Sequence, residues 1–190
     1  TLSDGLAHYG INTGFGSLSR QRIAPGDLRT LQRNLIRSHA AGVGDPLPNE
    51  VVRAMMLLLA ASLCRGNSGV RPVLAETVVA LLNAGITPIV PETGSVGASG
   101  DLAPLSHVAL ALIGEGEVMH EGRRIAASAA MSVANITPIT LEAKEGLALI
   151  NGTHLMAAMG ALACADAEVL IGWALGAAAV AAQRPADIVF

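Results

Sequence analysis

The sequence predicts a mainly α-helical protein with a small β-hairpin and short extended segments. Hydrophobic residues make up 52% of the 190 residues and aromatic residues only 2%, which favours a core of closely packed aliphatic helices. Several apolar stretches repeat with the three- and four-residue spacing of helices, and glycines and prolines mark many of their ends. The length fits one domain, residues 1–190, which is long enough to bury a substantial core.

Three helices are predicted in the first half of the chain, at residues 27–41, 48–65 and 72–84. In the first of them, the residues from Leu28 to Ile36 keep one face apolar. Pro48 and Pro72 lie in the first turns of the other two, where a missing N–H is tolerated. We expect the segment 86–91 to be extended, because its two prolines fix the path of the backbone.

In the second half of the chain, the sequence predicts helices at 102–113, 141–150 and 155–182, and a β-hairpin at 117–125. Asp101 is expected to cap the first of these helices, and Ser128 and Thr140 to cap two shorter ones. The hairpin is expected to turn at Glu121-Gly122. The last helix is apolar on every side and must be covered, and a helical oligomer would supply that cover.

Composition argues against two classes of partner and indicates a compartment. The net charge is −3 and no basic block is present, so nucleic-acid binding is not expected. The longest uncharged apolar run, from Val169 to Ala182, is shorter than the roughly 20 residues of a membrane-spanning helix, so no membrane partner is expected. Cys64 and Cys164 lie far apart in apolar stretches, and no signal-peptide pattern is seen. This pattern predicts buried free thiols and a cytoplasmic protein.

The loop from Gly94 to His107 carries residues that can form a group absent from the standard side chains. Ala98-Ser99-Gly100 stands at its centre. If the Gly100 nitrogen meets the carbonyl carbon of Ala98, a five-membered ring can close with loss of water, and glycine offers no side chain to obstruct the attack. Dehydration of Ser99 then leaves an exocyclic methylidene, which is a carbon electrophile.

Other interpretations of this loop stay open from its residues alone. Glycine-rich turns before helices often serve structure or bind anions. The hydrolase pattern G-x-S-x-G is not matched by Gly97-Ala98-Ser99-Gly100-Asp101. A triad of Ser99, Asp101 and His107 is conceivable, but spacing in the sequence does not give its geometry.

The loop resembles the signature of the aromatic amino acid ammonia-lyases, in which Ala-Ser-Gly matures into 4-methylidene-imidazole-5-one (MIO). Three further segments, Tyr9–Gly16, Ser38-His39 and Asn151-Gly152-Thr153, are similar to motifs of the same family. The resemblance covers nearly the whole chain in order. It implies the N-terminal, MIO-bearing domain of the ammonia-lyase (fumarase/aspartase-like) fold, because chains of this family are more than twice as long.

The resemblance implies a role for each motif. Tyr9 would be the catalytic base, and Asn151 would lie beside the prosthetic ring and the substrate. Leu102 would touch the substrate side chain. Ser38-His39 is typical of histidine ammonia-lyases, where tyrosine lyases carry His-Leu and phenylalanine lyases Phe-Leu. His39 would then contact the substrate imidazole, and the alternative is a helix-end residue satisfied by the backbone.

The implied reaction is elimination of ammonia from a small amino acid, L-histidine, to give urocanate. MIO formed from Ala98-Ser99-Gly100 would be the electrophile, and no metal or diffusible cofactor is expected. The family resemblance also implies a homotetramer. One alternative is a tyrosine or phenylalanine ammonia-lyase or an aminomutase, which His154 keeps open because many histidine enzymes carry glutamine there. Another is a non-catalytic helical fragment.

Overall fold

The computed structural model describes residues 4, 6–97 and 99–182, and within them the chain is mainly helical. The helices are α1 (Leu28–His39), α2 (Asn49–Cys64), α3 (Pro72–Asn83), α4 (Leu102–Leu112), α5 (Ala127–Val133), α6 (Glu145–Ile150) and α7 (His154–Ala182). The strands are β1 (Val43–Pro46), β2 (Thr87–Pro88), β3 (Pro91–Thr93), β4 (Glu117–His120) and β5 (Arg123–Ala126). The predicted fold class is therefore confirmed, including the three helices of the first half and the long helix at the end.

Two small antiparallel sheets lie beside the helices. The predicted hairpin is formed by β4 and β5, and β2 adds to it in the order β2-β4-β5. Its turn residues, Glu121 and Gly122, both have positive φ, 50° and 73°, as tight hairpin turns require. The second sheet pairs β1 with β3 and was not predicted, because the Val-Gly-Asp-Pro sequence of β1 has no alternating pattern and all four residues are exposed.

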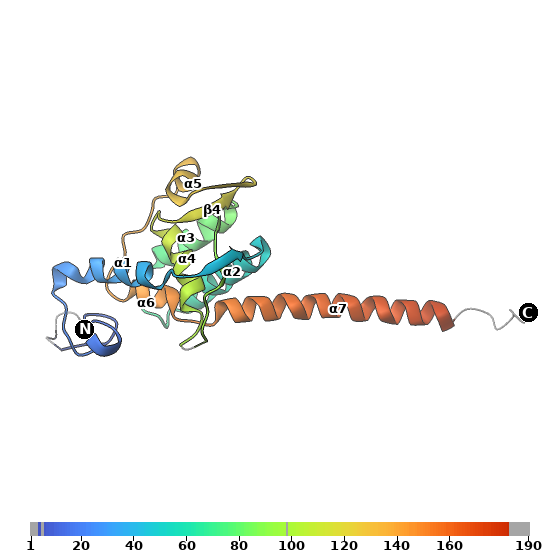
Figure 1. The fold of residues 1–190 in the computed structure, drawn as a ribbon, viewed down its shortest axis with the longest axis horizontal. Helices are drawn as coiled ribbons and strands as arrows, with labels where there is room; N and C mark the ends of the chain where they lie inside the picture. The colour runs from blue at the N-terminus through green and yellow to red at the C-terminus, as the bar shows by residue number, and fades with distance from the viewer. Residues whose placement is uncertain (1–3, 5, 98, 183–190) are drawn as a thin grey trace, which may run out of the picture.

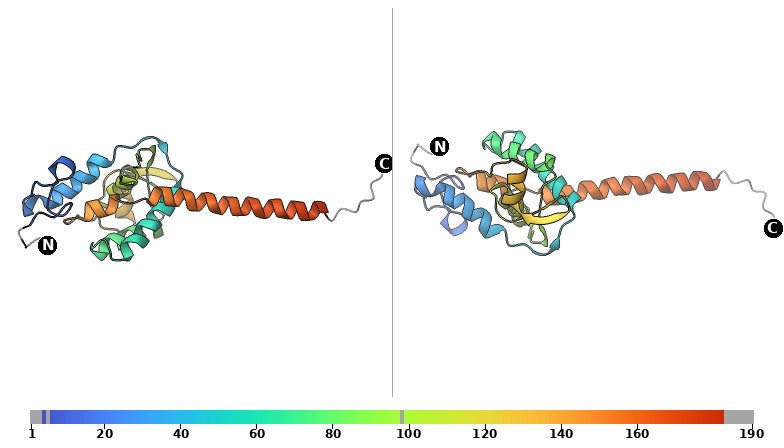
Figure 2. Two further views of the ribbon diagram at one scale, coloured as in Figure 1. Left: turned by 90° about the horizontal axis from the view of Figure 1, so that it is seen from below. Right: turned by 90° about the horizontal axis from the view of Figure 1, so that it is seen from above.

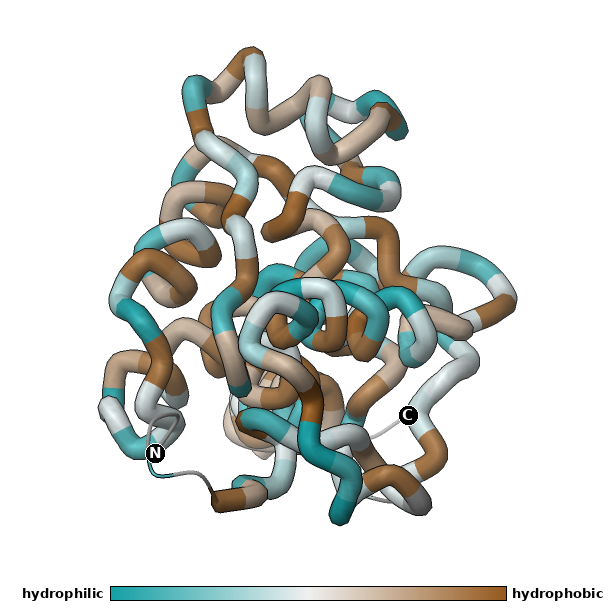
Figure 3. Tube along the Cα trace, turned by 90° about the vertical axis from the view of Figure 1, so that its left-hand side faces the viewer, coloured by the Kyte–Doolittle hydropathy of each residue, from teal (hydrophilic) through white to brown (hydrophobic). Residues whose placement is uncertain are grey.

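The core is aliphatic, as the composition predicts. The fully buried side chains include Met55 on α2, Leu81 on α3, Leu105 on α4 and Leu149 on α6. Apolar and polar residues alternate along the helical turns of the body (Figure 3). The body therefore has helices with one face packed inward, which is the pattern expected of a globular helical domain.

Two predicted helix starts are wrong. Ser128 does not cap α5, because the helix begins at Ala127 and its cap residue, Ala126, makes no side-chain cap bond. Thr140 does not cap α6, because residues 141–144 stay outside the helix and Lys144 enters it with φ at 74°. The Ala127 N–H donates to the Gly116 carbonyl oxygen, and Glu145 in the first turn of α6 accepts from Arg71, so contacts with distant residues accompany both starts in place of a hydroxyl cap.

The last helix, α7, extends away from the body (Figures 1 and 2). Only Leu155 and Ala158 of this helix are buried, and Trp173 is 75% exposed. By length and composition alone, the helical stretch Glu145–Ala182 would pass as a membrane span, and its most apolar window is 11% buried. The prediction of buried thiols is wrong, because Cys64 and Cys164 are free but exposed, the latter on this uncovered helix.

Candidate active site

The glycine-rich loop is anchored by Asp101, whose carboxylate caps a distant helix. Asp101 has no exposed surface. Its Oδ2 accepts hydrogen bonds from the N–H groups of Leu155 at 2.9 Å and Met156 at 3.1 Å, in the first turn of α7. Asp101 stands at the predicted N-cap position of α4, but its side chain makes no cap hydrogen bond to that helix. A negative charge at the N-terminus of α7 is favourable in its own right.

The backbone at Asp101 brings Gly100 against the Asn-Gly-Thr segment. The Asp101 N–H donates to the carbonyl oxygen of Gly152 at 2.7 Å. Gly100 has φ at 96°, and a Cβ on it would collide with the same Gly152 carbonyl. Position 100 therefore needs glycine for two reasons: its backbone has a positive φ, and the Gly152 carbonyl leaves no space for a side chain. Two segments that the sequence predicts to be functional thus lie side by side.

Ser99 stands at the exposed tip of this anchored loop. It has φ at 63°, in the left-handed region that side chains other than glycine rarely occupy. Leu102, the first residue of α4, is half-buried and packs against the hydrophobic core. Ala98 lies outside the described residues. The loop thus presents Ser99 to solvent while the residue after it is held in place.

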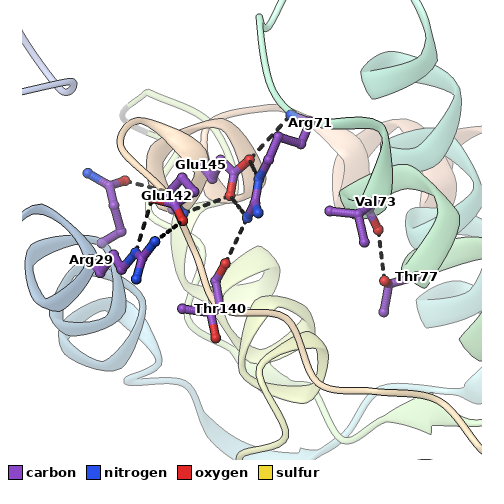
Figure 4. A network of polar contacts seen from close by, with 9 residues as sticks. Arg29, Arg71, Val73, Thr77, Thr140, Glu142 and Glu145 are labelled. Atoms are coloured by element: carbon purple, nitrogen blue, oxygen red, sulfur yellow. Dashed lines mark hydrogen bonds and ion pairs between the residues drawn. The ribbon is translucent and has the colours of Figure 1, made fainter. Parts of the chain in front are cut away.

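The short helix α6 ends just before Asn151, and an ion pair between the buried Glu145 and the exposed Arg71 holds its first turn (Figure 4). Glu145 is 2% exposed, and its carboxylate accepts hydrogen bonds from Arg71 Nε at 2.8 Å and Nη2 at 2.7 Å. Burial by itself would raise the pKa of Glu145, but hydrogen bonds from Arg71 and from the backbone of Glu142 and Arg71 lower it below its ordinary value of 4.5. Arg71 also donates to the Thr140 carbonyl at 2.7 Å, so it ties the loop before α6 as well.

A buried glutamine joins α6 to the helix that carries Ser38 and His39. Gln32 on α1 has no exposed surface, and its Oε1 accepts from the N–H groups of Gly146 at 2.9 Å and Leu147 at 3.3 Å. A Cβ on Gly146 would lie 2.8 Å from the backbone oxygen of Gln32, so the two helices approach closely. This contact therefore links the helix that precedes Asn151 to the helix that carries Ser38 and His39.

His39 lies at the end of α1, and one of its ring nitrogens is satisfied by the backbone. Nδ1 lies 2.9 Å from the Leu35 carbonyl oxygen and 3.1 Å from Ser38 Oγ, which itself donates to the same carbonyl. A carbonyl can only accept, so Nδ1 carries a proton in this arrangement, and in the neutral form of the ring Nε2 is then the acceptor. Nδ1 of His39 thus makes the backbone contact expected of a helix-end residue. In the neutral ring, Nε2 remains free to accept a hydrogen bond from a ligand.

The chain after His39 passes the start of the glycine-rich loop. A Cβ on Gly94 would lie 3.1 Å from the Cα of Gly42. The N–H of Gly42 donates to His107 Nε2 at 3.2 Å, and burial lowers the pKa of His107 below 6.5, which favours the neutral acceptor. His107 therefore binds the backbone that follows α1. Its Nε2 is occupied by this bond and is not available for a triad with Ser99 and Asp101.

Tyr9 lies in an N-terminal loop that docks on α6. The adjacent Gly10 has φ at 71°, and a Cβ there would collide with the Leu147 side chain. Tyr9 is 59% exposed, and its ring meets the ring of Phe15 edge-on, with centroids 6.0 Å apart. The loop of Tyr9 and the residue Asn151 therefore both border α6. Among the described contacts, neither the Tyr9 side chain nor the His39 side chain reaches Ser99.

Several residues that position this site were not predicted from the sequence. They are Gln32, Arg71, Glu145 and the α7-capping role of Asp101. The sequence gives only a weak signal for the burial of Glu145, which is that a charged residue stands next to an apolar run. Its partner Arg71 is 74 residues away, so the sequence does not indicate the pair. Among the described residues, no cluster of three or more His, Cys, Asp or Glu side chains is placed to hold a metal ion.

Comparison with known proteins identifies the class to which this helical fold and loop belong. The family model for aromatic amino acid lyases matches residues 1–184. Histidine ammonia-lyase from Geobacillus thermodenitrificans (strain NG80-2) is 59% identical over 169 residues, which are 89% of this chain and 34% of that protein. Histidine ammonia-lyase from Koribacter versatilis (strain Ellin345) is 54% identical over 190 residues, 99% of this chain and 37% of that protein.

Solved structures give the same class. Phenylalanine aminomutase from Pantoea agglomerans superposes with a TM-score of 0.86 at 37% identity, covering 92% of this chain and 33% of that one. Histidine ammonia-lyase from Trypanosoma cruzi superposes with a TM-score of 0.77 at 44% identity, covering 85% and 31%. The chain belongs to the aromatic amino acid lyase family, and it spans about a third of the length of the curated relatives it matches, in their N-terminal part.

Proposed function

We propose that this chain is the N-terminal part of a histidine ammonia-lyase, a carbon–nitrogen lyase that releases ammonia from L-histidine and leaves urocanate. The observation that carries the proposal is the junction of the Ser99-Gly100 loop with Asn151-Gly152, held by Asp101. The identity of 54–59% to histidine ammonia-lyases over most of the chain supports this substrate. The Ser38-His39 pair at the end of α1 supports it independently.

The residues of the loop fit the formation of MIO from Ala98-Ser99-Gly100. Gly100 has no Cβ where none would fit, and Ser99 holds a left-handed conformation at an exposed tip. The nitrogen of Gly100 bonds to the Ala98 carbonyl carbon, whose oxygen leaves as water, and Ser99 loses a second water from its Cα–H and Oγ. Once formed, the group supplies an electrophilic carbon for the amine of the substrate.

The side chains around the loop then have separate roles. Tyr9, the phenol of the N-terminal loop that docks on α6, takes a proton from the β-carbon of the substrate, which is adjacent to the carbon that carries the leaving amine. Asn151 donates from its amide to the ring derived from Ser99, because its neighbour Gly152 contacts Gly100. Leu102 packs against the substrate side chain, and His39 accepts the substrate's imidazole N–H at Nε2.

The exposed surface of α7 supports a proposal about assembly. Ile171, Trp173 and Leu175 are 59%, 75% and 67% exposed, and a soluble monomer rarely exposes a continuous apolar surface of this kind. We propose that helices from the rest of the protein and from further copies cover α7 in a homo-oligomer, a tetramer by the family resemblance. The complete protein would then be cytoplasmic and would need no membrane and no nucleic acid.

The test is product formation by the complete protein with three substrates. L-Histidine should give urocanate with a kcat/KM well above that for L-phenylalanine or L-tyrosine. Faster release of cinnamate or coumarate would assign the protein to another branch of the same chemistry. No product from any of the three, in a tetramer with an unmodified mass, would favour a non-catalytic helical protein.

An aminomutase is the second candidate, and one observation favours it. The Pantoea phenylalanine aminomutase superposes with a TM-score of 0.86, above the 0.77 of the Trypanosoma histidine ammonia-lyase. Chromatography of the reaction would decide, because a mutase converts the α-amino acid into its β-isomer and a lyase releases free ammonia.

A further inference from the structure

We propose that His107 is a positioning residue for substrate selectivity: through the backbone of Gly42 it fixes where the end of α1, and with it the imidazole of His39, lies relative to the glycine-rich loop. The inference rests on the proposed function, because it assumes that His39 contacts the substrate. It gives a role to a half-buried histidine on α4 that the proposed mechanism does not use.

The ring of His39 moves with the last turn of α1, because its own helix holds it. Nδ1 lies 2.9 Å from the carbonyl oxygen of Leu35, which is one turn earlier on the same helix. Turning the ring would break this contact, so the location of Nε2 follows the location of the helix end. A shift of the helix end would therefore carry the imidazole away from the substrate.

Backbone hydrogen bonds run without a break from His39 to Gly42. The first N–H after His39 continues the bonding of α1 at 3.0 Å, and the second donates to the His39 carbonyl at 2.8 Å. Ala40, between them, has φ at −77° and ψ at 60°, the geometry of an inverse γ-turn. The third N–H is that of Gly42, and it donates to His107 Nε2 at 3.2 Å. The path from His39 to α4 is thus bonded at every residue.

Gly42 lies in a narrow space between three segments. A Cβ on it would lie 3.1 Å from His107 Nε2 and 3.2 Å from two side-chain carbons of Pro91 on β3. A Cβ on Gly94, where the glycine-rich loop begins, would lie 3.1 Å from the Cα of Gly42. The location of Gly42 therefore sets the spacing between the end of α1 and the start of the loop.

The other side-chain ties of α1 lie before His39. Gln32 binds α6 two turns earlier, through its Oε1. Arg37 pairs with Glu115 at 2.7 Å, but its side chain is 46% exposed, and ion pairs at the surface contribute little. Among the described hydrogen bonds, the bond to His107 is the first after His39 that ties the chain to another helix.

Removing the acceptor on His107 would release this connection. Burial lowers the pKa of His107 below 6.5, so the ring is neutral at pH 7 and Nε2 can accept. Without Nε2, the half-buried N–H of Gly42 finds a partner only in water, which draws the backbone outward. The loop keeps its own anchor, because Ser95 Oγ donates to the Asp101 carboxylate at 2.9 Å. Selectivity should therefore change while the loop still matures.

The experiment measures kcat and KM of the complete protein for L-histidine and L-phenylalanine, with melting temperature and intact mass in parallel. His107→Leu has a side chain of similar size and no acceptor. We expect its KM for histidine to rise about 10-fold, which is the effect of a displacement of well under 1 Å, with kcat nearly unchanged. The ratio of kcat/KM between histidine and phenylalanine should fall by the same factor, and the loss of water from the loop should match the wild type. A smaller folded fraction would instead lower turnover of both substrates equally.

Three further variants separate positioning from packing. His107→Gln offers an amide oxygen to Gly42 and should recover most of the KM. Gly42→Ala places a methyl group 3.1 Å from His107 Nε2 and should raise the KM for histidine with His107 intact. His120→Leu is the matched control, because His120 on β4 is also half-buried and its Nδ1 has no hydrogen-bond partner among the described residues. It should keep the wild-type selectivity.

Wild-type selectivity in His107→Leu would overturn the inference. A loss that falls equally on both substrates, or one that His107→Gln fails to restore, would overturn it as well. If His107→Leu does not fold, Gly42→Ala takes its place, and an unchanged ratio between the two substrates then overturns the inference. A wild-type enzyme that prefers phenylalanine would instead contradict the proposed function, and the inference with it.

Discussion

Removing the carboxylate of Asp101 is expected to destabilise the protein more than any other single change in the loop. Asp101→Ala leaves two N–H groups of α7 without their acceptor, and that of Leu155 is buried. Loss of a cap costs about 1 to 2 kcal/mol, and a buried N–H left without a partner costs about 1 to 3 kcal/mol more. We therefore expect a loss of about 3 kcal/mol in the free energy of unfolding, or roughly 6 to 12 °C in the melting temperature for a chain of this size.

Calorimetry and urea unfolding of the full chain measure this loss. Asp101→Asn keeps an acceptor for α7 and loses the charge, so it should cost about 1 kcal/mol. Asp45→Ala is the control, because Asp45 is an exposed aspartate on β1 and no hydrogen bond holds its side chain among the described residues. A loss below about 1 kcal/mol for Asp101→Ala, equal to that of Asp45→Ala, would refute the argument that this carboxylate ties the loop to α7.

Four further features, Glu145, His39, Ser99 and α7, each give a testable expectation. Glu145→Gln should lower stability by about 1 to 3 kcal/mol at pH 7, because Arg71 loses its charged partner. The pKa of Glu145 is lower in the folded state than its ordinary 4.5, so the wild type should lose stability in urea titrations as the pH falls below about 4.5, and a slope unchanged in Glu145→Gln would contradict the assignment. His39→Leu should lower kcat/KM for histidine relative to phenylalanine by up to about 10⁴-fold, and an unchanged ratio would remove His39 from the substrate site. Ser99→Ala should keep its full mass and lose activity, and residual wild-type turnover would disprove its role. Sedimentation at low micromolar concentration should give an oligomer that covers α7, and a well-behaved monomer would count against that proposal.

The elements of the fold were predictable because their signals are local. Periodic apolar residues, prolines at first turns and the Glu121-Gly122 turn gave α1 to α4, the hairpin and α7 to within a few residues. The exceptions, β1 and α6, lack such local signals. Strand β1 has no alternation to detect, and α6 starts four residues later than a threonine cap would place it, because Glu145 is held by Arg71 from another part of the chain.

The candidate site was predictable only in its chemical motifs. Ser99, Gly100 and Asn151 carry recognisable patterns, and the structure brings the loop of the first two to the segment of the third. The residues that hold them together do not show themselves in the sequence. Asp101 stands at the cap position of the next helix, α4, yet its side chain caps α7, because tertiary packing brings the N-terminus of α7 to this buried carboxylate.

The intact mass of the full-length wild-type chain tests the maturation of the loop most directly. We expect a mass two waters below that of the unmodified sequence, with the loss located by peptide fragmentation to Ala98-Ser99-Gly100 and absent from Ser99→Ala. A wild-type chain that produces urocanate from L-histidine while every peptide across this loop keeps its unmodified mass would contradict it.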